Sequence, residues 1–567
     1  MHRWGPLSSL LAAGLFLAVT ADAPAAEPRA WWVFLADKGV APALADDLAR
    51  SRAADLLSAR ALERRRKARG DAPVDALDLP LRADHVRRVL ATGARERHRL
   101  RWFNAVTVDA TDEQVRAIRA LPFVARVKPV VRQVHRYGEP DPADARPRGP
   151  EGAVPRGGPV YGECASQLVP IQVDQLHALG LSGAGVRVAV FDTGFLRTHV
   201  AFASTNVVAE HDFLQDDGNT ANEPGDPSGQ HNHGTYVLSL IGGHDPGNLV
   251  GPAHGAEFVL AKTEDVASET PAEEDHWAAA AQWADSLGAD VISSSLAYYD
   301  WYTYEDLDGD TATITIAADL AAANGIVVFN SAGNEGLSPW FHVGTPADGD
   351  SVIAVGAVDS TGTVVEFSSH GPTADGRIKP DVCAMGEGTL VALTFDDVSY
   401  ARGNGTSFSC PIAAGVGALL LEAHPEWGPW EVREALRSTA SQAGAPDNDA
   451  GWGAIRAFDA YGHATSASLA TVRTGRAIRA YPNPSVGATT LAWSLPRHEA
   501  IRSLEIVDAA GRRVRTVSAP GGGGGGHEGA VSWDGRDDGA RPVPGGVYFA
   551  RLVTATAVHS CRVVRIR

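Results

Sequence analysis

Hydrophobic and polar positions follow different patterns along the chain and divide it into regions. Between residues 27 and 136, alternating or apolar runs predict strands at AWWVFLADKG, NAVTVDA and VARVKPVVRQV. Helical spacing predicts helices over residues 44–67 and at TDEQVRAIRAL, whose opening threonine is typical of an N-cap. This region therefore predicts a small α+β domain.

Residues 161–464 alternate apolar strands with Ala-rich helices. The strand candidates VRVAVFDTG, ADVISSSL, GIVVFNSAG and SVIAVGAV are mostly apolar, a pattern typical of parallel strands buried between helices. The fold class expected here is α/β, a parallel sheet covered by helices on both faces. Residues 477–567 show short β patterns punctuated by Gly and Pro, which predict a β-sandwich of about seven strands.

Segments without periodicity separate these regions. Residues 137–160 predict an exposed linker rich in Pro, Gly and charge, residues 465–476 a short connector, and the glycines at 521–526 a flexible loop. Residues 1–26 begin with His2 and Arg3, continue into an apolar run and end in small residues, which predicts a secretory signal peptide. A membrane anchor is the alternative. The run is short for a span, so we expect no transmembrane segment after signal removal.

Charge is distributed unevenly along the chain. The net charge of −18 argues against a nucleic-acid partner. Between Arg197 and Arg377 the only Lys or Arg is Lys262, whereas the upstream runs RALERRRKAR and HVRRVLATGARERHRLRW are basic. These runs predict salt-dependent docking on the acidic region, with solvated surface as the alternative. The four cysteines are too few for a disulfide scaffold, and their spacing does not reveal whether they pair.

Four polar side chains occur at turns where a predicted strand meets a loop or a helix. They are Asp192 in VAVFDTGF, His233 in HNHGTYVLSLIGG, Asn334 in IVVFNSAGNEG and Ser407 in GNGTSFSCPIAAG. Each alone fits a turn residue, a loop histidine or a helix cap. Together they supply a nucleophile, a base, an acid that orients the base and an oxyanion donor at one sheet edge.

The segments FDTGF, HNHGTYVLS, SAGNEG and GTSFSCPIAAG resemble the signature segments of the subtilisin-like serine proteases, in that family's order of Asp, His and Ser. The resemblance covers roughly residues 161–461. It implies that Ser407 is the nucleophile, with His233 as general base and Asp192 orienting the imidazole. Asn334 and the Ser407 backbone N–H are implied as oxyanion donors.

The same resemblance implies where a substrate binds. An extended peptide would add to the strand in ADVISSSLAYYD by β-augmentation. The implied substrate-binding residues are Ser295, Leu296, Ala297 and Glu335. Ala297 replaces the family's usual glycine, so primary specificity does not follow from the resemblance. Pro411 is expected in the first turn of the Ser407 helix, where no backbone N–H is needed.

Two acidic segments carry further hypotheses. In EDVASETPAEED, Glu264, Glu269 and Glu273 border the implied upstream pockets and predict a preference for Lys or Arg there. The alternative is a solvated loop that caps the next helix through a box at 270–273. In DLDGDTAT, Asp306, Asp308 and Asp310 suggest structural calcium, although the glycine is misplaced for an EF-hand. No cofactor is otherwise required.

The flanking regions also resemble known companions of such proteases. Residues 27–136 resemble an inhibitor-type prosegment, which implies a zymogen that cleaves itself between Val131 and Tyr161 and whose prosegment is an intramolecular inhibitor. The segments YPNPS, LEIVDAAGRRVRTV and SWDGRDDGARPVPGGVYFARL resemble the immunoglobulin-like FlgD-type repeat of terminal sorting domains, which implies a secretion machinery as partner; a passive stalk is the alternative.

The expected function is that of a secreted or cell-surface serine endopeptidase acting on protein or peptide substrates at the extracellular side of a bacterial envelope. One alternative is a catalytically silent, surface-attached peptide-binding protein, which the intact set of four groups disfavours. An esterase or lipase is the other, disfavoured because GTSFS is not a G-x-S-x-G elbow and because the acid precedes the base.

Overall fold

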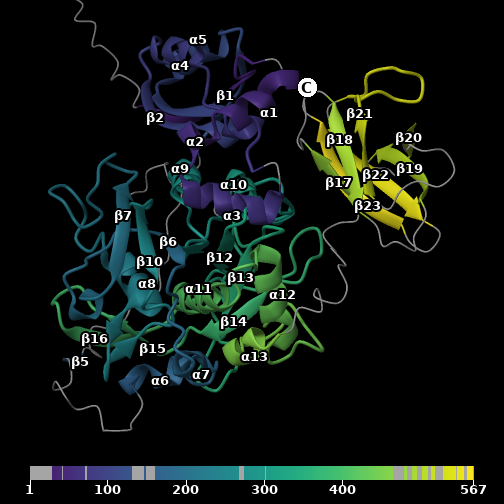
Figure 1. Cartoon of the computed structure of the whole chain (residues 1–567). Coiled ribbons are helices and arrows are strands. Elements are labelled where there is room, and N and C mark those ends of the chain that lie inside the picture. The colour runs from purple at the N-terminus through teal and green to yellow at the C-terminus, as the bar shows by residue number, and fades with distance from the viewer. Residues whose placement is uncertain are drawn as a thin grey trace, which may run out of the picture. The chain divides into compact units, whose positions relative to one another are not determined.

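The structure, a computed structural model, describes residues 28–40, 42–70, 73–130, 146–147, 160–266, 274–299, 302–463, 478–481, 488–494, 501–508, 512–517, 528–544, 546–554 and 558–565. The expected signal peptide, connector and glycine loop, most of the linker, Glu269 and the capping box at 270–273 lie outside these residues. The chain divides into two compact units, residues 1–463 and 464–567 (Figure 1). We call 28–130 the N-terminal domain, 160–463 the central domain and 478–565 the C-terminal domain.

The N-terminal domain is built on an antiparallel sheet of order β2-β3-β1-β4. Its strands are β1 (Arg29–Leu35), β2 (Arg95–Leu100), β3 (Ala105–Ala110) and β4 (Val124–Pro129). Helices α4 (Ala83–Leu90) and α5 (Asp112–Arg119) accompany the sheet. The cap expected for α5 is confirmed, because the Gln114 backbone N–H donates to Thr111 Oγ1 and the Thr111 N–H donates to the Gln114 side chain.

The single helix predicted over residues 44–67 is wrong. The structure has three helices there, α1 (Pro42–Ser51), α2 (Ala53–Leu56) and α3 (Ala59–Arg69). The reason is Ser58, whose hydroxyl accepts from the Ala61 backbone N–H at 3.2 Å and so starts a new helix inside the predicted one. Strand β2, within the basic run, was also not predicted, because its residues RERHRL lack an apolar face.

The central domain confirms the predicted α/β class. Seven parallel strands form one sheet of order β14-β13-β12-β11-β6-β10-β7. In chain order they are β6 (Arg187–Asp192), β7 (Asn206–Asp212), β10 (Glu257–Lys262), β11 (Val291–Ser294), β12 (Val327–Ser331), β13 (Ile353–Val358) and β14 (Val382–Met385). A hairpin of β15 (Thr389–Ala392) and β16 (Ser399–Gly403) lies outside this sheet and pairs with β5 (Arg146–Pro147), and β8 (His244–Asp245) pairs with β9 (Leu249–Val250).

Helices cover both faces of the parallel sheet. On β6, Val188 and Val190 belong to one apolar cluster and Ala189 and Phe191 to the other, so the strand is buried on both sides. The first cluster includes α8 (Asn232–Gly242), α11 (Thr406–Ala423), α12 (Pro429–Thr439) and α13 (Ala457–Tyr461), with α6 (Ala165–Leu168) and α7 (Val173–Ala178) beside them. The second includes α9 (Glu274–Leu287) and α10 (Thr313–Ala323).

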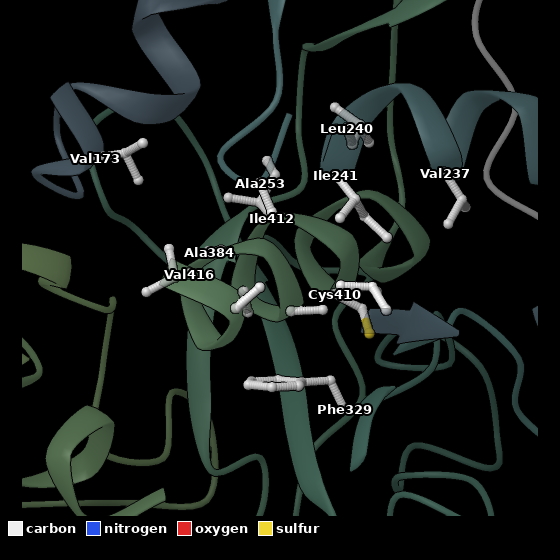
Figure 2. Close-up of a cluster of buried hydrophobic side chains, with 14 of the residues drawn as sticks. Val173, Val237, Leu240, Ile241, Ala253, Phe329, Ala384, Cys410, Ile412 and Val416 are labelled. Carbon is white, nitrogen blue, oxygen red and sulfur yellow. The ribbon is translucent and has the colours of Figure 1, made fainter. Parts of the chain in front are cut away.

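Helix α11 runs through the first cluster. Figure 2 shows Cys410, Ile412 and Val416 of α11 in the same group of buried side chains as Val237 and Ile241 of α8. By length and composition α11 is apolar enough to cross a membrane, yet 83% of it is buried within the domain. It is therefore a core helix, and its fixed position determines where Ser407 lies.

The N-terminal domain packs on helix α9 of the central domain, with α3 beside it (Figure 1). At the end of α9, the Arg65 guanidinium donates to Asp285 at 3.0 Å and to Asp78 of its own domain at 2.8 Å. Arg64 also pairs with Asp285, and these side chains are at most 5% exposed. At the start of α9, Arg97 of β2 pairs with Asp275 at 2.9 Å.

The C-terminal domain consists of two antiparallel sheets of orders β17-β18-β21 and β20-β19-β22-β23. They pack on a common core that includes Leu491 and Trp533 from one sheet and Ile506, Leu552 and Val563 from the other. The described strands are β17 (Ile478–Tyr481), β18 (Thr489–Ser494), β19 (Ile501–Asp508), β20 (Arg513–Val517), β21 (Glu528–Trp533), β22 (Gly546–Thr554) and β23 (Val558–Arg565). This is the predicted sandwich arrangement.

The cysteine question left open by the sequence is answered by the structure. Cys164, Cys383, Cys410 and Cys561 are all buried, and none of them is in a disulfide. Burial raises the pKa of Cys410, three residues after Ser407, to about 12, which keeps its thiol protonated at neutral pH.

Candidate active site

Asp192 and His233 form a buried pair at the carboxyl edge of the parallel sheet. Asp192 is the last residue of β6 and His233 the second residue of α8. The imidazole Nδ1 of His233 lies 2.7 Å from Asp192 Oδ1. The Asp192 side chain is 0% exposed and the His233 side chain 4% exposed. An Nδ1 that faces a carboxylate carries the proton, which leaves Nε2 of the neutral ring as the basic nitrogen.

The close approach of α8 to the end of β6 depends on Gly234. A Cβ at this position would lie 2.2 Å from the Gly194 carbonyl oxygen and 3.0 Å from the Asp192 Cβ. A larger residue would therefore push the helix away from the strand and lengthen the Asp192–His233 contact. Gln230, just before α8, also connects this helix to the loops that follow β6 and β10. Its side-chain amide donates to the Thr193 carbonyl at 2.6 Å and to the Glu264 carbonyl at 2.5 Å.

Ser407 is the second residue of α11, and Gly405 before the helix has φ 151°, a conformation that favours glycine. The helix N-terminus directs backbone N–H groups and the positive end of its dipole toward this serine. The imidazole of His233 stacks on the ring of the next residue, Phe408, with centroids 6.3 Å apart. The structure thus brings Ser407 and His233 into the same corner of the domain.

Ser407 and Ser295 are joined by two reciprocal hydrogen bonds. The Ser407 hydroxyl donates to the Ser295 carbonyl at 3.2 Å, and the Ser295 hydroxyl donates to the Ser407 carbonyl at 2.9 Å. The second bond is explained by Pro411, which lies inside α11 and not in its first turn as expected. A residue at 411 would normally donate to the Ser407 carbonyl, and proline has no N–H to give.

Asn334 follows β12 and is held by the residue before Ser407. Its Oδ1 accepts from the Thr406 backbone N–H at 2.8 Å and from the Thr406 hydroxyl at 2.9 Å. With the oxygen fixed in this way, the Nδ2 group is the donor that the side chain can offer to a ligand. Thr406 was not among the residues predicted from the sequence, although its place beside Ser407 was a signal.

Two other histidines of the central domain, His231 and His199, have different partners. His231 Nδ1 accepts from the Asn222 backbone N–H at 3.0 Å. His199 is buried, caps a short helical turn through the Ala201 N–H at 3.1 Å and contacts the Ser399 carbonyl at 3.1 Å. Neither has a carboxylate contact like that of His233 in the described part of the chain.

Of the implied substrate-binding residues, Ser295 contacts Ser407 directly. Ser295 and Leu296 follow β11 and are 3% and 1% exposed, and Ala297 packs against Gly344, where a Cβ would come within 2.9 Å of its methyl group. Glu335 is buried and accepts a hydrogen bond from the Tyr299 hydroxyl. Tyr299 in turn stacks on Trp340, with centroids 5.7 Å apart.

Of the three glutamates proposed for upstream substrate recognition, only Glu264 lies among the described residues. Glu264 is 0% exposed and accepts from the Tyr298 hydroxyl, so it supports the loop from inside and does not border a pocket. Glu273, like Glu269, lies outside the described residues. The expectation about Glu264 is therefore wrong, because its burial could not be deduced from a charge-rich sequence.

The residues present do not fit a calcium ion well. Asp306 accepts from the Thr303 N–H, and Asp308 accepts from the Asp310 and Thr311 N–H groups, so these carboxylates stabilise turns. Among the described residues, three His, Cys, Asp or Glu side chains converge within reach of one ion only at Asp212, Asp217 and Glu223. There the Lys262 ammonium already pairs with Asp212 at 2.7 Å and with Asp226 at 2.8 Å.

Comparisons with known proteins agree with this geometry. Residues 183–453 match the profile of the subtilase family, Peptidase S8, and residues 30–144 match the Peptidase S8 propeptide domain of Bacteroidota. The chain is 30% identical to subtilisin E of Bacillus subtilis over 355 residues, covering 62% of this chain and 79% of that protein. It is 33% identical to a subtilisin of Bacillus pumilus over 288 residues, covering 49% and 94%.

The fold has a solved counterpart. The structure of fervidolysin from Fervidobacterium pennivorans, described as a keratinolytic enzyme related to subtilisin, aligns with a TM-score of 0.55 and 21% identity. The alignment covers 93% of this chain and 70% of that one.

Proposed function

The chain is a subtilisin-like serine endopeptidase that belongs to the subtilase family and carries a propeptide domain, and on this premise we propose that Asp192, His233 and Ser407 are its catalytic triad. The observation that carries the proposal is the buried Asp192–His233 contact of 2.7 Å at the sheet edge where α11 presents Ser407. Under this proposal Asp192 holds the neutral imidazole in the tautomer whose Nε2 is basic.

Each chemical step can be assigned to groups of this chain. Ser407 Oγ attacks the peptide carbonyl carbon while its proton passes to His233 Nε2, and the oxyanion accepts from the Asn334 Nδ2 group and the Ser407 backbone N–H. The imidazolium then gives its proton to the leaving amine as the C–N bond breaks. Water hydrolyses the acyl-enzyme by the same route in reverse, with His233 again as base.

We further propose that the N-terminal domain is an intramolecular inhibitor removed by self-cleavage between Val131 and Tyr161. Its buried contacts with α9 and the strand β4, which runs toward this segment, support the proposal. Residues 1–26 are proposed as an export signal, and the C-terminal domain as an immunoglobulin-like sorting domain of FlgD type that contacts a secretion machinery at the cell envelope. The two-sheet arrangement of that domain is consistent with this role.

A fluorophosphonate probe tests the triad. We expect it to label Ser407 in the processed protein, as mapped by peptide mass spectrometry. The matched variant Ser407→Ala should remain unlabelled and accumulate as a folded precursor with its N-terminal domain still attached. Labelling of a different serine would overturn the assignment, and so would processing of the Ser407→Ala protein in a host without other proteases.

A further inference from the structure

Glu274, the first residue of α9, has a buried carboxylate oxygen with no hydrogen-bond partner. The side chain is 0% exposed, its Oε1 accepts from the Tyr302 hydroxyl, and its Oε2 has no donor. A buried acceptor left without a donor costs free energy, more so when the group is ionised. Such a group marks a place where a ligand's donor would be stabilising.

The N-terminal domain presents a cation to this carboxyl group. Lys128 of β4 donates to the Thr313 hydroxyl and lies 5.5 Å from the centre of the Trp32 ring. Burial raises the pKa of Glu274, an effect that Asp275 strengthens and Lys128 and Tyr302 oppose. Burial also lowers the pKa of Lys128, which Glu274 opposes and Arg126 reinforces. The two groups attract each other, but they form no hydrogen bond.

The first turn of α9 contacts the strand expected to bind the peptide, because the Trp277 indole N–H donates to the Ser294 hydroxyl of β11 at 3.0 Å. Trp277, one turn along α9 from Glu274, belongs to the same apolar cluster as Leu296 and Ile314. Leu296 follows Ser295, which is hydrogen-bonded to Ser407. The N-terminal domain also contributes to this cluster, with Trp32 and Val130 among its members. When that domain leaves, the cluster loses these residues, and Glu274 loses the nearby charge of Lys128.

We propose that Glu274 is a specificity-determining residue that binds a lysine or arginine side chain of the substrate upstream of the cleaved bond. This inference rests on the proposed function and refines its substrate class. A basic side chain would bring to Oε2 the donor that it lacks, with Trp277, Leu296 and Ile314 contacting its aliphatic stem. The preference suggested by the acidic loop is thus retained, but it is assigned to Glu274 instead of Glu264.

The alternative is that Glu274 serves only the docking of the N-terminal domain through Lys128. Substrate profiling separates the two. The processed protein is assayed with peptides that carry Lys, Arg or Gln at each upstream position in turn. We expect kcat/KM to favour Lys or Arg over Gln by about tenfold at one position. Glu274→Gln should reduce that ratio to within about twofold, and the matched variant Glu264→Gln should retain it.

A pH series adds a readout that a purely structural role would not move. In the docked protein, burial raises the pKa of Glu274. In the processed protein the Lys preference should appear as pH rises through the pKa of this carboxyl group, and the ratio in Glu274→Gln should be flat.

Fluorophosphonate labelling of the same samples separates the two levels of failure. A labelled Ser407 with no upstream charge preference, or with the same preference in Glu274→Gln, overturns the role of Glu274 and leaves the triad intact. An unlabelled Ser407 together with no peptide cleavage overturns the proposed function and, with it, this inference.

Discussion

The two ends of helix α9 hold the N-terminal domain in opposite ways. At its C-terminal end Asp285 is bound by the guanidinium groups of Arg64 and Arg65, which stay charged at any ordinary pH. At its N-terminal end the contact includes two imidazoles, His98 Nε2 lying 2.6 Å from His276 Nδ1. The C-terminal end is thus a permanent anchor, whereas the N-terminal end combines the Arg97–Asp275 pair with a contact that depends on protonation.

The geometry of the N-terminal end requires neutral imidazoles. Arg97 donates to His276 Nε2 at 2.8 Å, so that nitrogen accepts, and His276 Nδ1 carries the proton that it donates to His98. A proton added to either ring would place two N–H groups face to face. Burial lowers the pKa of both imidazoles in agreement with this arrangement. Control of docking by protonation therefore lies at one end of the helix, and the other end carries permanent charges only.

Replacing Arg65 with Met should disrupt the buried ion pairs that form the anchor at the C-terminal end of α9. Of the changes considered, we expect this one to have the largest effect. The change leaves Asp78 and Asp285 buried with one partner fewer each, and we expect the free energy of unfolding to fall by about 3–5 kcal/mol. The measurement is denaturant unfolding of the Ser407→Ala precursor, which cannot digest itself. Arg66→Ala, at an exposed position of the same helix, is the matched control and should stay within about 0.5 kcal/mol. Equal stability of the two variants would contradict the anchor.

Acidification should selectively weaken the contact between the N-terminal domain and the N-terminal end of α9. Because both pKa values are lowered in the docked state, docking is constant above the ordinary histidine pKa of 6.5 and weakens as pH falls below it. Each imidazole can contribute up to about tenfold per pH unit in the dissociation constant. Arg97 and His211 oppose protonation of His98, and Asp275 and Asp216 favour it, but burial is the largest influence.

This pH dependence can be measured as dissociation of the cleaved N-terminal domain from the processed protein between about pH 7.5 and 5.5, a range that spans the histidine pKa. The double variant His98→Gln/His276→Gln keeps similar side-chain volume but lacks the titration, and its dissociation constant should change little over this range. If the double variant shows the same acid dependence as the wild type, other groups control release.

Salt should have the smallest effect of the three changes. The opposite charges of the sequence predict docking that weakens with salt, yet the pairs at both ends of α9 are at most 10% exposed, apart from the partly exposed Arg101 beside Asp285. Buried pairs are screened little, so we expect less than about a threefold change in the dissociation constant between roughly 50 and 500 mM salt. A steep salt dependence would show that exposed charges dominate docking.

The fold and the candidate site could be predicted from the sequence wherever a local pattern of residues determines the structure. Asp192 and Asn334 follow apolar parallel strands, and the ends of such strands meet at one edge of a sheet. Burial of charged residues was not predictable, because it depends on which helix face meets which neighbour. Glu264 and Glu274 both occur near one acidic run, and only packing distinguishes the buried support from the carboxylate that lacks a donor.

The same limit applies to the N-terminal domain. Its basic runs predicted attraction to the acidic domain, but the sequence did not reveal that Arg65 bridges Asp78 and Asp285. Such a bridge depends on Asp285, which is 220 residues away from Arg65 in the chain. The break of the predicted helix at Ser58 is a local capping effect, hidden because the surrounding residues all have helical spacing.

The proline inside α11 has a consequence for how sequence changes combine. Because Pro411 cannot donate to the Ser407 carbonyl, the Ser295 hydroxyl supplies that hydrogen bond from a different strand. An alanine at 411 would restore a donor within the helix and make the serine hydroxyl redundant, whereas loss of Ser295 is tolerable only after that restoration. The two positions are therefore epistatic: evolution can pass from one arrangement to the other by changing 411 first, and the reverse order leaves the carbonyl of the nucleophile without a donor.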